Sequence, residues 1–392
     1  MTVILKKDQE FLNSIKKTLA PFKAGVKRKA QGELPYDYLV PSGYYEEQWD
    51  WDAFFIGMAL ASDIPSEGIF LRNVALNLLH NSRNDGYIPG CITKDGPEGG
   101  HRSFLMKPFL AQGAYFASNF LKDFSWIAPH FSQLKTVVLY REKNVWNKKY
   151  NLGVWTNIMA SGADNNVSGF GYPENSVVAT DLNTFVYQEY KAMSLIAEQL
   201  RKTKEYDYFS KRASEIKNNI NKYLWDESDG IYYNIDSRDG SFIKRVSYNS
   251  FHPLWAHIAN KERTNKFIKN YVLNSKKLWS NYGIRTLAKD DKEYNNANII
   301  KPYSNWQGPV WPIANYFAVS ALLNYGFQKE AVDVAKKVAK LCLDDIKKTG
   351  GMHENYDAET GLPIAAPNFI SWNLLVPVML EDALTNKSRF AL

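Results

Sequence analysis

Apolar residues recur along most of the chain at the three- and four-residue spacing of amphipathic helices. This pattern predicts twelve helices, at 8–18, 50–62, 66–80, 104–121, 127–141, 180–201, 205–223, 251–259, 263–272, 308–325, 328–348 and 371–384. Strand signals gather in one place, where 231–236 and 241–246 flank a turn at 237–240. The chain is therefore predicted to be all-α, with a small β-hairpin as a decoration.

The links between the predicted helices alternate in length. Short links occupy 63–65, 122–126, 202–204, 260–262 and 326–327, and helices joined in this way are antiparallel neighbours. Long links occupy 19–49, 81–103, 142–179, 224–250, 273–307 and 349–370. If the helices run up and down, all six long links lie at one end, where a site is usually built. No Pro-, Ser- or Gly-rich linker divides the chain, so one domain over 1–392 is expected.

The composition favours a carbohydrate ligand. The 392 residues include 11 Trp, 24 Tyr and 21 Phe, which is more aromatic surface than a core needs and suits stacking on sugar rings. The net charge of +7 comes from scattered lysines without a dense basic block, so we expect no nucleic-acid partner.

Other classes of site find little support. Cys91 and Cys342 are the only cysteines and no metal-binding spacing occurs, so neither a disulfide framework nor a metal or cofactor is expected. The N-terminal segment lacks the apolar stretch of a signal peptide, which predicts a cytoplasmic location. No apolar run is long enough to span a membrane.

Glu354 lies in 350–357, Gly-Gly-Met-His-Glu-Asn-Tyr-Asp, directly after a predicted helix. The two glycines end that helix, because glycine readily supplies the positive φ of a helix end. Glu354 is therefore expected on a loop among hydrogen-bonding and aromatic neighbours, where a carboxylate can act as a general base. An exposed loop Glu is the alternative. Asp164, on the Gly-bearing loop 161–166 of another long link, supplies a second carboxylate and favours the catalytic interpretation.

The segment Trp49-Asp50-Trp51-Asp52 closes the first long link and opens a helix. Asp50 can cap that helix, but two Trp and two Asp exceed what a cap requires. Trp offers a face for sugar C–H groups and Asp accepts hydrogen bonds from neighbouring hydroxyls, so we interpret the segment as ligand-binding. A cation site made by Asp50 and Asp52 is the alternative.

Further tryptophans come from other long links. Trp306 and Gln307 precede the helix predicted at 308–325, and Trp372 starts the last helix from the same end. Gln112, one turn beyond Pro108, is expected to point toward the loop end of its helix, with a buried and satisfied Gln as the alternative. These residues are predicted to line or support one pocket.

Four motifs occur in a fixed order along the chain: Trp49-Asp50-Trp51-Asp52, then Ser-Gly-Ala-Asp-Asn at 161–165, Trp-Gln-Gly-Pro-Val-Trp-Pro at 306–312 and Gly-Met-His-Glu-Asn-Tyr-Asp-Ala-Glu-Thr-Gly at 351–361. Together they resemble glycoside hydrolase family 63, and they are similar to the related trehalase family. The resemblance extends from residue 49 to the end of the chain.

The resemblance implies an (α/α)6 barrel, a toroid of six helical hairpins, that hydrolyses an α-linked glucoside or related small α-glycoside with inversion. It assigns the general acid to Asp164 and the general base to Glu354, and it requires no metal or cofactor. The substrate-binding residues implied by the motifs and by the expected pocket are Trp49, Asp50, Trp51, Asp52, Phe54, Gln112, Gly162, Asn165, Trp306, Gln307, Gly308, Trp311, His353, Tyr356 and Trp372.

The sequence departs from the family pattern after the proposed acid. Trehalases and several relatives acting on glycosyl-glycerates carry an Arg-Trp there, whereas Asp164 is followed by Asn165-Asn166-Val167-Ser168-Gly169-Phe170. This departure counts against trehalose as the substrate. The chain is also short beside the N-glycan-processing glucosidases, which have an added β-domain. A compact single-barrel member acting on a small glycoside or oligosaccharide fits best.

Two other functions remain open at this point. A sugar epimerase or isomerase on the same toroid would use paired histidines, and only His101, His252 and His353 lie on or beside long links. A non-catalytic glycan-binding protein would keep the aromatic face and need neither carboxylate.

Overall fold

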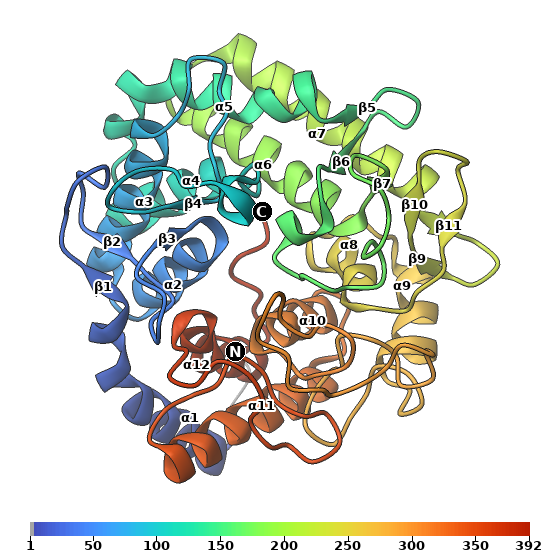
Figure 1. The fold of residues 1–392 in the computed structure, drawn as a ribbon. Coiled ribbons are helices and arrows are strands. Elements are labelled where there is room, and N and C mark those ends of the chain that lie inside the picture. Colours follow the sequence, from blue (N-terminus) through green and yellow to red (C-terminus); the bar gives the residue numbers. More distant parts are fainter. Residues whose placement is uncertain (1–3) are drawn as a thin grey trace.

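The computed structural model describes residues 4–392, and within them twelve α-helices form a closed ring (Figure 1). The inner helices are α2 (Asp50–Asp63), α4 (Leu110–Leu121), α6 (Thr180–Gln199), α8 (His252–Trp255), α10 (Pro312–Asn324) and α12 (Val376–Thr385). The outer helices are α1 (Lys6–Leu19), α3 (Gly68–His80), α5 (Phe131–Asn144), α7 (Thr203–Tyr223), α9 (Lys261–Phe267) and α11 (Gln328–Thr349). The structure therefore has the predicted six-hairpin toroid.

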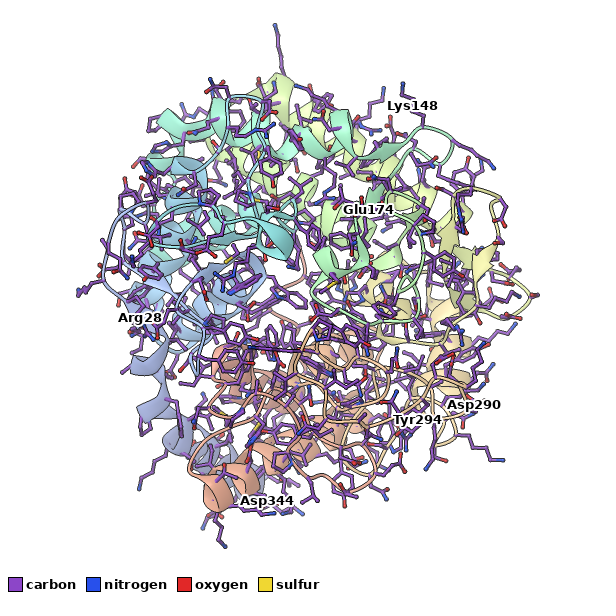
Figure 2. All side chains as sticks on the ribbon, in the orientation of Figure 1. Arg28, Lys148, Glu174, Asp290, Tyr294 and Asp344 are labelled. Atoms are coloured by element: carbon purple, nitrogen blue, oxygen red, sulfur yellow. The ribbon has the colours of Figure 1, made fainter. Side chains whose placement is uncertain are left out.

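Burial separates the two rings of helices. Every residue of α10 from Pro312 to Leu323 is buried, as expected for a helix that is apolar on all sides. The outer helix α11 buries a single stripe that includes Ala331, Val334, Ala335 and Val338. Helix α1 packs against α11 and α12, which closes the ring between the two ends of the chain. Charged side chains such as Lys148 and Asp344 lie on the outer edge (Figure 2).

Short strands decorate the links. A five-stranded antiparallel sheet has the order β11 (Phe242–Ile243), β10 (Asn234–Asp236), β7 (Val177–Val178), β6 (Leu152–Trp155) and β5 (Trp146–Asn147). Three two-stranded pairs join β1 (Lys27–Arg28) to β2 (Tyr38–Leu39), β3 (Gln48–Trp49) to β4 (Cys91–Ile92) and β8 (Trp225–Asp226) to β9 (Ile231–Tyr232).

The predicted hairpin is present as the pair β10–β11, with Asn234 opposite Ile243. It is shorter than predicted, because Ile231 and Tyr232 pair with β8 instead. The other strands were not predicted, since two to four residues are too few to show an alternating pattern.

The largest helix correction concerns the segment predicted at 104–121. The α-helix begins only at Leu110, because Pro108 has no N–H to donate and disfavours helical geometry at Lys107. The helices predicted at 251–259 and 308–325 are also shorter, at His252–Trp255 and Pro312–Asn324. Phe251 lies in a short 3-10 helix, and turns or extended chain replace the other predicted ends.

Five of the six long links contribute residues to one pocket, among them Arg102 from 81–103 and Glu354 from 349–370. The sixth, 224–250, is joined to the link 142–179 through β10 and β7. The alternation of link lengths thus predicted where the site would be built.

Candidate active site

The pocket is a cavity of about 390 Å³ at the centre of the gathered links. It is lined by aromatic, acidic and basic side chains from segments far apart in sequence. The lining residues include Tyr44, Tyr45, Glu47, Trp49, Asp50, Trp51, Asp52, Arg102, Lys107, Met159, Gly162, Asp164, Ile300, Lys301, Tyr303, Ser304, Trp311, Glu354, Phe369 and Trp372.

Asp164 and Glu354 both face this pocket, and Ser304 touches both. The Ser304 N–H donates to Asp164 Oδ2 at 2.9 Å, and the Ser304 hydroxyl donates to Glu354 Oε2 at 3.2 Å. Because the N and Oγ of one serine lie about 3 to 4 Å apart, the two carboxylate oxygens lie within about 10 Å of each other. The two carboxyls therefore face the same small volume.

The loops that carry the two carboxyls are fixed by local features. Gly162 has φ +80°, and a Cβ there would meet the Trp51 ring at 2.5 Å, so only glycine fits beside the pocket wall. Glu354 is 5% exposed, and its N–H donates to the Ala365 carbonyl at 2.9 Å. Asp164 is more exposed and faces the cavity.

Burial raises the pKa of Asp164 to about 6, while the Ser304 N–H and the charge of Lys107 act to lower it. Burial, and then the negative charges of Asp164 and Asp52, raise the pKa of Glu354 to about 8, against the Ser304 hydroxyl. Near pH 7 the pair therefore holds one proton, which is what acid–base catalysis by two carboxyls needs.

Asp50 and Asp52 differ in their surroundings. Asp50 pairs with the ammonium of Lys107 at 3.0 Å and accepts the Lys107 N–H at 2.6 Å. Asp52 accepts a hydrogen bond from the Ser371 hydroxyl at 2.6 Å, and burial raises its pKa to about 7. Asp50 is thus occupied by an ion pair, whereas Asp52 has capacity for a ligand. Among the described side chains of residues 4–392, which leave out that of His101, no group of three or more His, Cys, Asp or Glu is arranged to hold a metal ion.

Four tryptophans form one contiguous cluster at the pocket. Trp51 lies 5.4 Å from Trp372 and 6.3 Å from Trp306, and Trp306 stacks on Trp311 at 4.0 Å between ring centroids. Trp51, Trp311 and Trp372 line the cavity, while Trp306 is buried behind them. Trp49 lines the cavity from the strand β3.

Several predicted substrate-binding residues lie behind the pocket wall. Gln112 is fully buried, and its amide donates to the carbonyls of Pro108 and Phe185 at 2.5 and 3.3 Å. Its side chain points toward helix α6, which carries Phe185. Phe54 stacks on Phe109 at 4.8 Å inside the core. Neither residue lines the cavity.

Asn165, Gln307 and Gly308 also lie outside the lining, and Asn165 and Gln307 join two links. Asn165 Oδ1 accepts the Trp306 N–H at 2.6 Å, and the Gln307 amide donates to the Asn165 carbonyl at 3.0 Å. Gly308 has φ +157°, and a Cβ there would lie 2.3 Å from the Asn295 carbonyl oxygen. These contacts brace the segment around Ser304 against the loop of Asp164.

His353 and Tyr356 flank Glu354 but turn away from the cavity. The His353 ring lies 2.9 Å from Asp345, and the Tyr356 hydroxyl donates to Asp345 at 3.1 Å. Their neighbour Glu354 faces the pocket instead, while Asp345 holds His353 and Tyr356 outside its lining.

Sequence reasoning missed Lys107, Ser304, Tyr45 and Phe369, all of which line the cavity. Ser304 lies two residues before the recognised motif at 306–312, so its position was a usable signal. Lys107 was assigned to a helix, although Pro108 was a signal against it. Tyr45 and Phe369 carry no signal of their own, since only the fold brings their links together.

The pocket offers no histidine pair among the described side chains. His252 is fully buried, and burial lowers its pKa to about 3. His353 is held by Asp345 outside the lining. The side chain of His101 lies outside the described part of the structure. The arrangement therefore favours chemistry by carboxyls over proton transfer by paired histidines.

Comparison with known proteins gives a consistent family. A model described as the mannosylglycerate hydrolase MGH1-like glycoside hydrolase domain matches residues 44–372. A mannosylglycerate hydrolase of Rubrobacter radiotolerans is 27% identical over 175 residues, which cover 44% of this chain and 37% of that protein. A periplasmic trehalase of Escherichia coli O1:K1 / APEC is 20% identical over 389 residues, which cover 83% of this chain and 64% of that protein. The matches thus span less than two thirds of these relatives' lengths.

A solved structure shares the fold. The family 63 mannosylglycerate hydrolase from Thermus thermophilus, in complex with Tris and D-glycerate, superposes with a TM-score of 0.75 at 17% identity. The alignment covers 94% of this chain and 100% of that one. The six-hairpin toroid is therefore common to both.

Proposed function

This chain belongs to the mannosylglycerate hydrolase MGH1-like glycoside hydrolase family, and on that premise we propose that it cleaves a small α-glycoside with inversion. An α-glucoside is the first candidate substrate. Asp164 acts as the general acid and Glu354 as the general base. The observation that carries the proposal is that two carboxyls with raised pKa values face one aromatic-walled pocket and share the contact residue Ser304.

In this mechanism Asp164 protonates the glycosidic oxygen as the bond to the anomeric carbon breaks. Glu354 takes a proton from a water that attacks the opposite face of the ring, which inverts the configuration. An inverting pair needs a separation of about 6.5 to 9.5 Å to leave room for that water. The joint contact with Ser304 is compatible with such a separation.

The reactive form requires the proton on Asp164 and not on Glu354. A sugar hydroxyl that donates to Asp52 spreads the charge of that carboxylate and so lowers the pKa of Glu354. Substrate binding then moves the shared proton toward Asp164.

The tryptophan cluster and Asp52 provide the binding site for the sugar ring. Trp51 and Trp372 offer apolar faces to C–H groups, and Asp52 accepts from hydroxyls. The relatives act on mannosylglycerate and trehalose, as their names state, which leaves both the sugar and the leaving group to be determined for this chain.

A substrate panel combined with two variants tests the proposal. The panel comprises aryl and alkyl α-glucosides and α-mannosides, their β-anomers, and trehalose. We expect turnover of an α-glycoside, with Asp164→Asn losing far more rate on alkyl than on activated aryl substrates. Glu354→Gln should slow both by about 10²- to 10⁴-fold. Full activity in Asp164→Asn, or turnover of β-anomers only, would contradict the proposal.

A further inference from the structure

We infer that the leaving group of the substrate is an uncharged ring with an apolar face, a second sugar or an aromatic alcohol, and not a carboxylic acid such as glycerate. This inference rests on the proposed function, because it concerns the part of the substrate beyond the bond that Asp164 protonates. It is carried by the charges of the pocket and by the side chains next to Asp164.

The described lining of the pocket is rich in acids. Five carboxyl side chains face three basic ones, namely Glu47, Asp50, Asp52, Asp164 and Glu354 against Arg102, Lys107 and Lys301. With one proton shared between Asp164 and Glu354, and with the pKa of Asp52 raised to about 7, the ionised acids about balance the bases near pH 7. A substrate carboxylate would therefore meet no excess positive charge to offset its burial away from water.

Arg102 and Lys107 are already paired. Arg102 Nη2 lies 2.6 Å from Glu47 Oε1, and Arg102 Nη1 contacts Glu98, so one guanidinium serves two carboxylates. Lys107 is buried with Asp50 at 3.0 Å. Recognition of a carboxylate normally uses the two-pronged geometry of a free guanidinium. Neither cation can supply it without leaving an acidic partner unpaired in the pocket.

Lys301 is the remaining base of the described lining, and it lies on the exposed part of the pocket mouth. An exposed lysine–carboxylate pair contributes only about 0 to 1 kcal/mol, because both groups stay hydrated. Lys301 therefore does not compensate for the acids deeper in the pocket.

The leaving-group side of the pocket can be located from Asp164. A general acid must contact the leaving oxygen, and the Ser304 N–H holds Asp164 from one side. Tyr303, the residue before Ser304, lines the cavity and packs edge-on against Phe170 at 5.2 Å. Ile300 lines the same mouth and is 39% exposed. These apolar faces suit the flat side of a sugar or aryl ring.

A matched pair of substrates tests the inference on the intact enzyme. The α-glycosides of glycerate and of glycerol carry the same sugar and differ in one carboxylate. We expect kcat/KM for the glycerol glycoside to exceed that for the glycerate glycoside about tenfold or more, equivalent to about 1.4 kcal/mol. The 4-nitrophenyl glycoside and a disaccharide test the two kinds of ring leaving group. Their kcat/KM values should exceed those of both the glycerol and the glycerate glycoside. A glycerate glycoside that equals or surpasses its glycerol counterpart would overturn the inference.

Two variants show which side chains determine the preference for an uncharged ring over glycerate as the leaving group. Tyr303→Ala should lower kcat/KM for the ring leaving groups about tenfold more than for a methyl glycoside, while Tyr303→Phe keeps the ring and retains the preference. Lys301→Ala should leave the glycerate-to-glycerol ratio within about threefold, as expected for an exposed pair. A selective loss of glycerate turnover in Lys301→Ala would assign an acid-binding role to Lys301 and contradict the inference. If no α-glycoside is hydrolysed at all, the proposed function fails instead.

Discussion

Ser304 donates a hydrogen bond to each of the two carboxyls of the pocket. Its backbone N–H is fixed by the fold, whereas its hydroxyl is a removable donor to Glu354. A donor to an ionised carboxylate lowers its pKa, so this hydroxyl opposes the burial that raises the pKa of Glu354. The balance of protons between acid and base is therefore set partly by one side chain that takes no part in the bond-breaking step.

The first prediction concerns the pH dependence of the wild-type enzyme. The pKa values of about 6 for Asp164 and about 8 for Glu354 belong to one coupled pair. Below the lower pKa both carboxyls are protonated, so the general base is lost. Above the higher pKa both carboxyls are ionised, so the general acid is lost. We expect kcat/KM to peak near pH 7 with limbs on both sides. A maximum below pH 5 would contradict this.

The second prediction concerns Ser304→Ala. Loss of the hydroxyl raises the pKa of Glu354 further, so the alkaline limb of kcat/KM should move to higher pH. The maximum rate should fall about 2- to 10-fold, because less of the enzyme carries the proton on Asp164. Ser304→Thr keeps a hydroxyl and is the control. An alkaline limb that stays in place in Ser304→Ala would show that the hydroxyl does not act on Glu354.

At this scale the sequence predicted residues that belong to recognisable motifs. Asp164 and Glu354 both lie where the motifs placed them, in one pocket. Lys107 was missed because the apolar residues around it continue a helical pattern until Pro108 interrupts it. Gln112 was placed in the pocket because the sequence does not show which face of its helix packs against α6, where its amide donates to the Phe185 carbonyl.

At the scale of elements, helix α11 holds the loop of the proposed base through Asp345. This buried carboxylate accepts hydrogen bonds from the His353 N–H at 2.8 Å, the Thr349 hydroxyl at 2.9 Å and the Tyr356 hydroxyl at 3.1 Å, and it contacts the His353 ring at 2.9 Å. These donors lie on both sides of Glu354. Asp345 is therefore a positioning residue for the loop.

The third prediction is that Asp345→Asn lowers kcat about tenfold or more with little change in KM, because a displaced base slows chemistry more than binding. Asp382→Asn is the matched control. Asp382 is also a buried carboxylate, paired with Arg389 on the last turns of the chain and outside the pocket lining. The Asp382→Asn substitution should lower the stability of the fold without lowering kcat. Equal kcat losses in the two variants would refute a positioning role for Asp345.

Helices were easier to predict than strands for a physical reason. The stripe of α11 repeats within the helix itself, so 22 residues carry the signal. Strand β7 has two residues, and its partners β6 and β10 come from different parts of the chain. Such pairing depends on the ring bringing the links together, and no local pattern encodes it.

At the scale of the whole molecule, the pocket buries carboxyls at a cost in stability. Asp52, Asp164 and Glu354 all have pKa values raised by burial. A group with a raised pKa in the folded state binds protons more tightly there than in the unfolded chain. Its contribution to stability is therefore complete below the unfolded pKa and is lost as pH rises through the folded value.

The fourth prediction follows for Glu354→Gln. The neutral amide cannot ionise, so the variant should be more stable than the wild type at pH 8 by about 1 to 3 kcal/mol, and the difference should vanish toward pH 4.5. Urea unfolding at pH 8 and at pH 4.5 measures the difference in the free energy of unfolding between the variant and the wild type. A difference that is independent of pH, or larger at the acidic end, would contradict the raised pKa of Glu354.

The up-and-down pairing of the helices was predictable from the alternation of short and long links, because helices joined by short links are antiparallel neighbours. Closure into a ring was implied only by the resemblance to the family. Within residues 4–392, none of the helices is long and apolar enough to cross a membrane. A single domain over 1–392 and a cytoplasmic location stay predictions of the sequence.

The measurement that tests the account most directly is the anomeric configuration of the first sugar released. Proton NMR, recorded within seconds of adding enzyme to an α-glycoside, separates the two anomers before mutarotation mixes them. Asp164 and Glu354 acting as acid and base across the ring predict that β-sugar appears first and α-sugar only later. Release of α-sugar first would contradict the inverting assignment and make one of the two carboxyls a nucleophile.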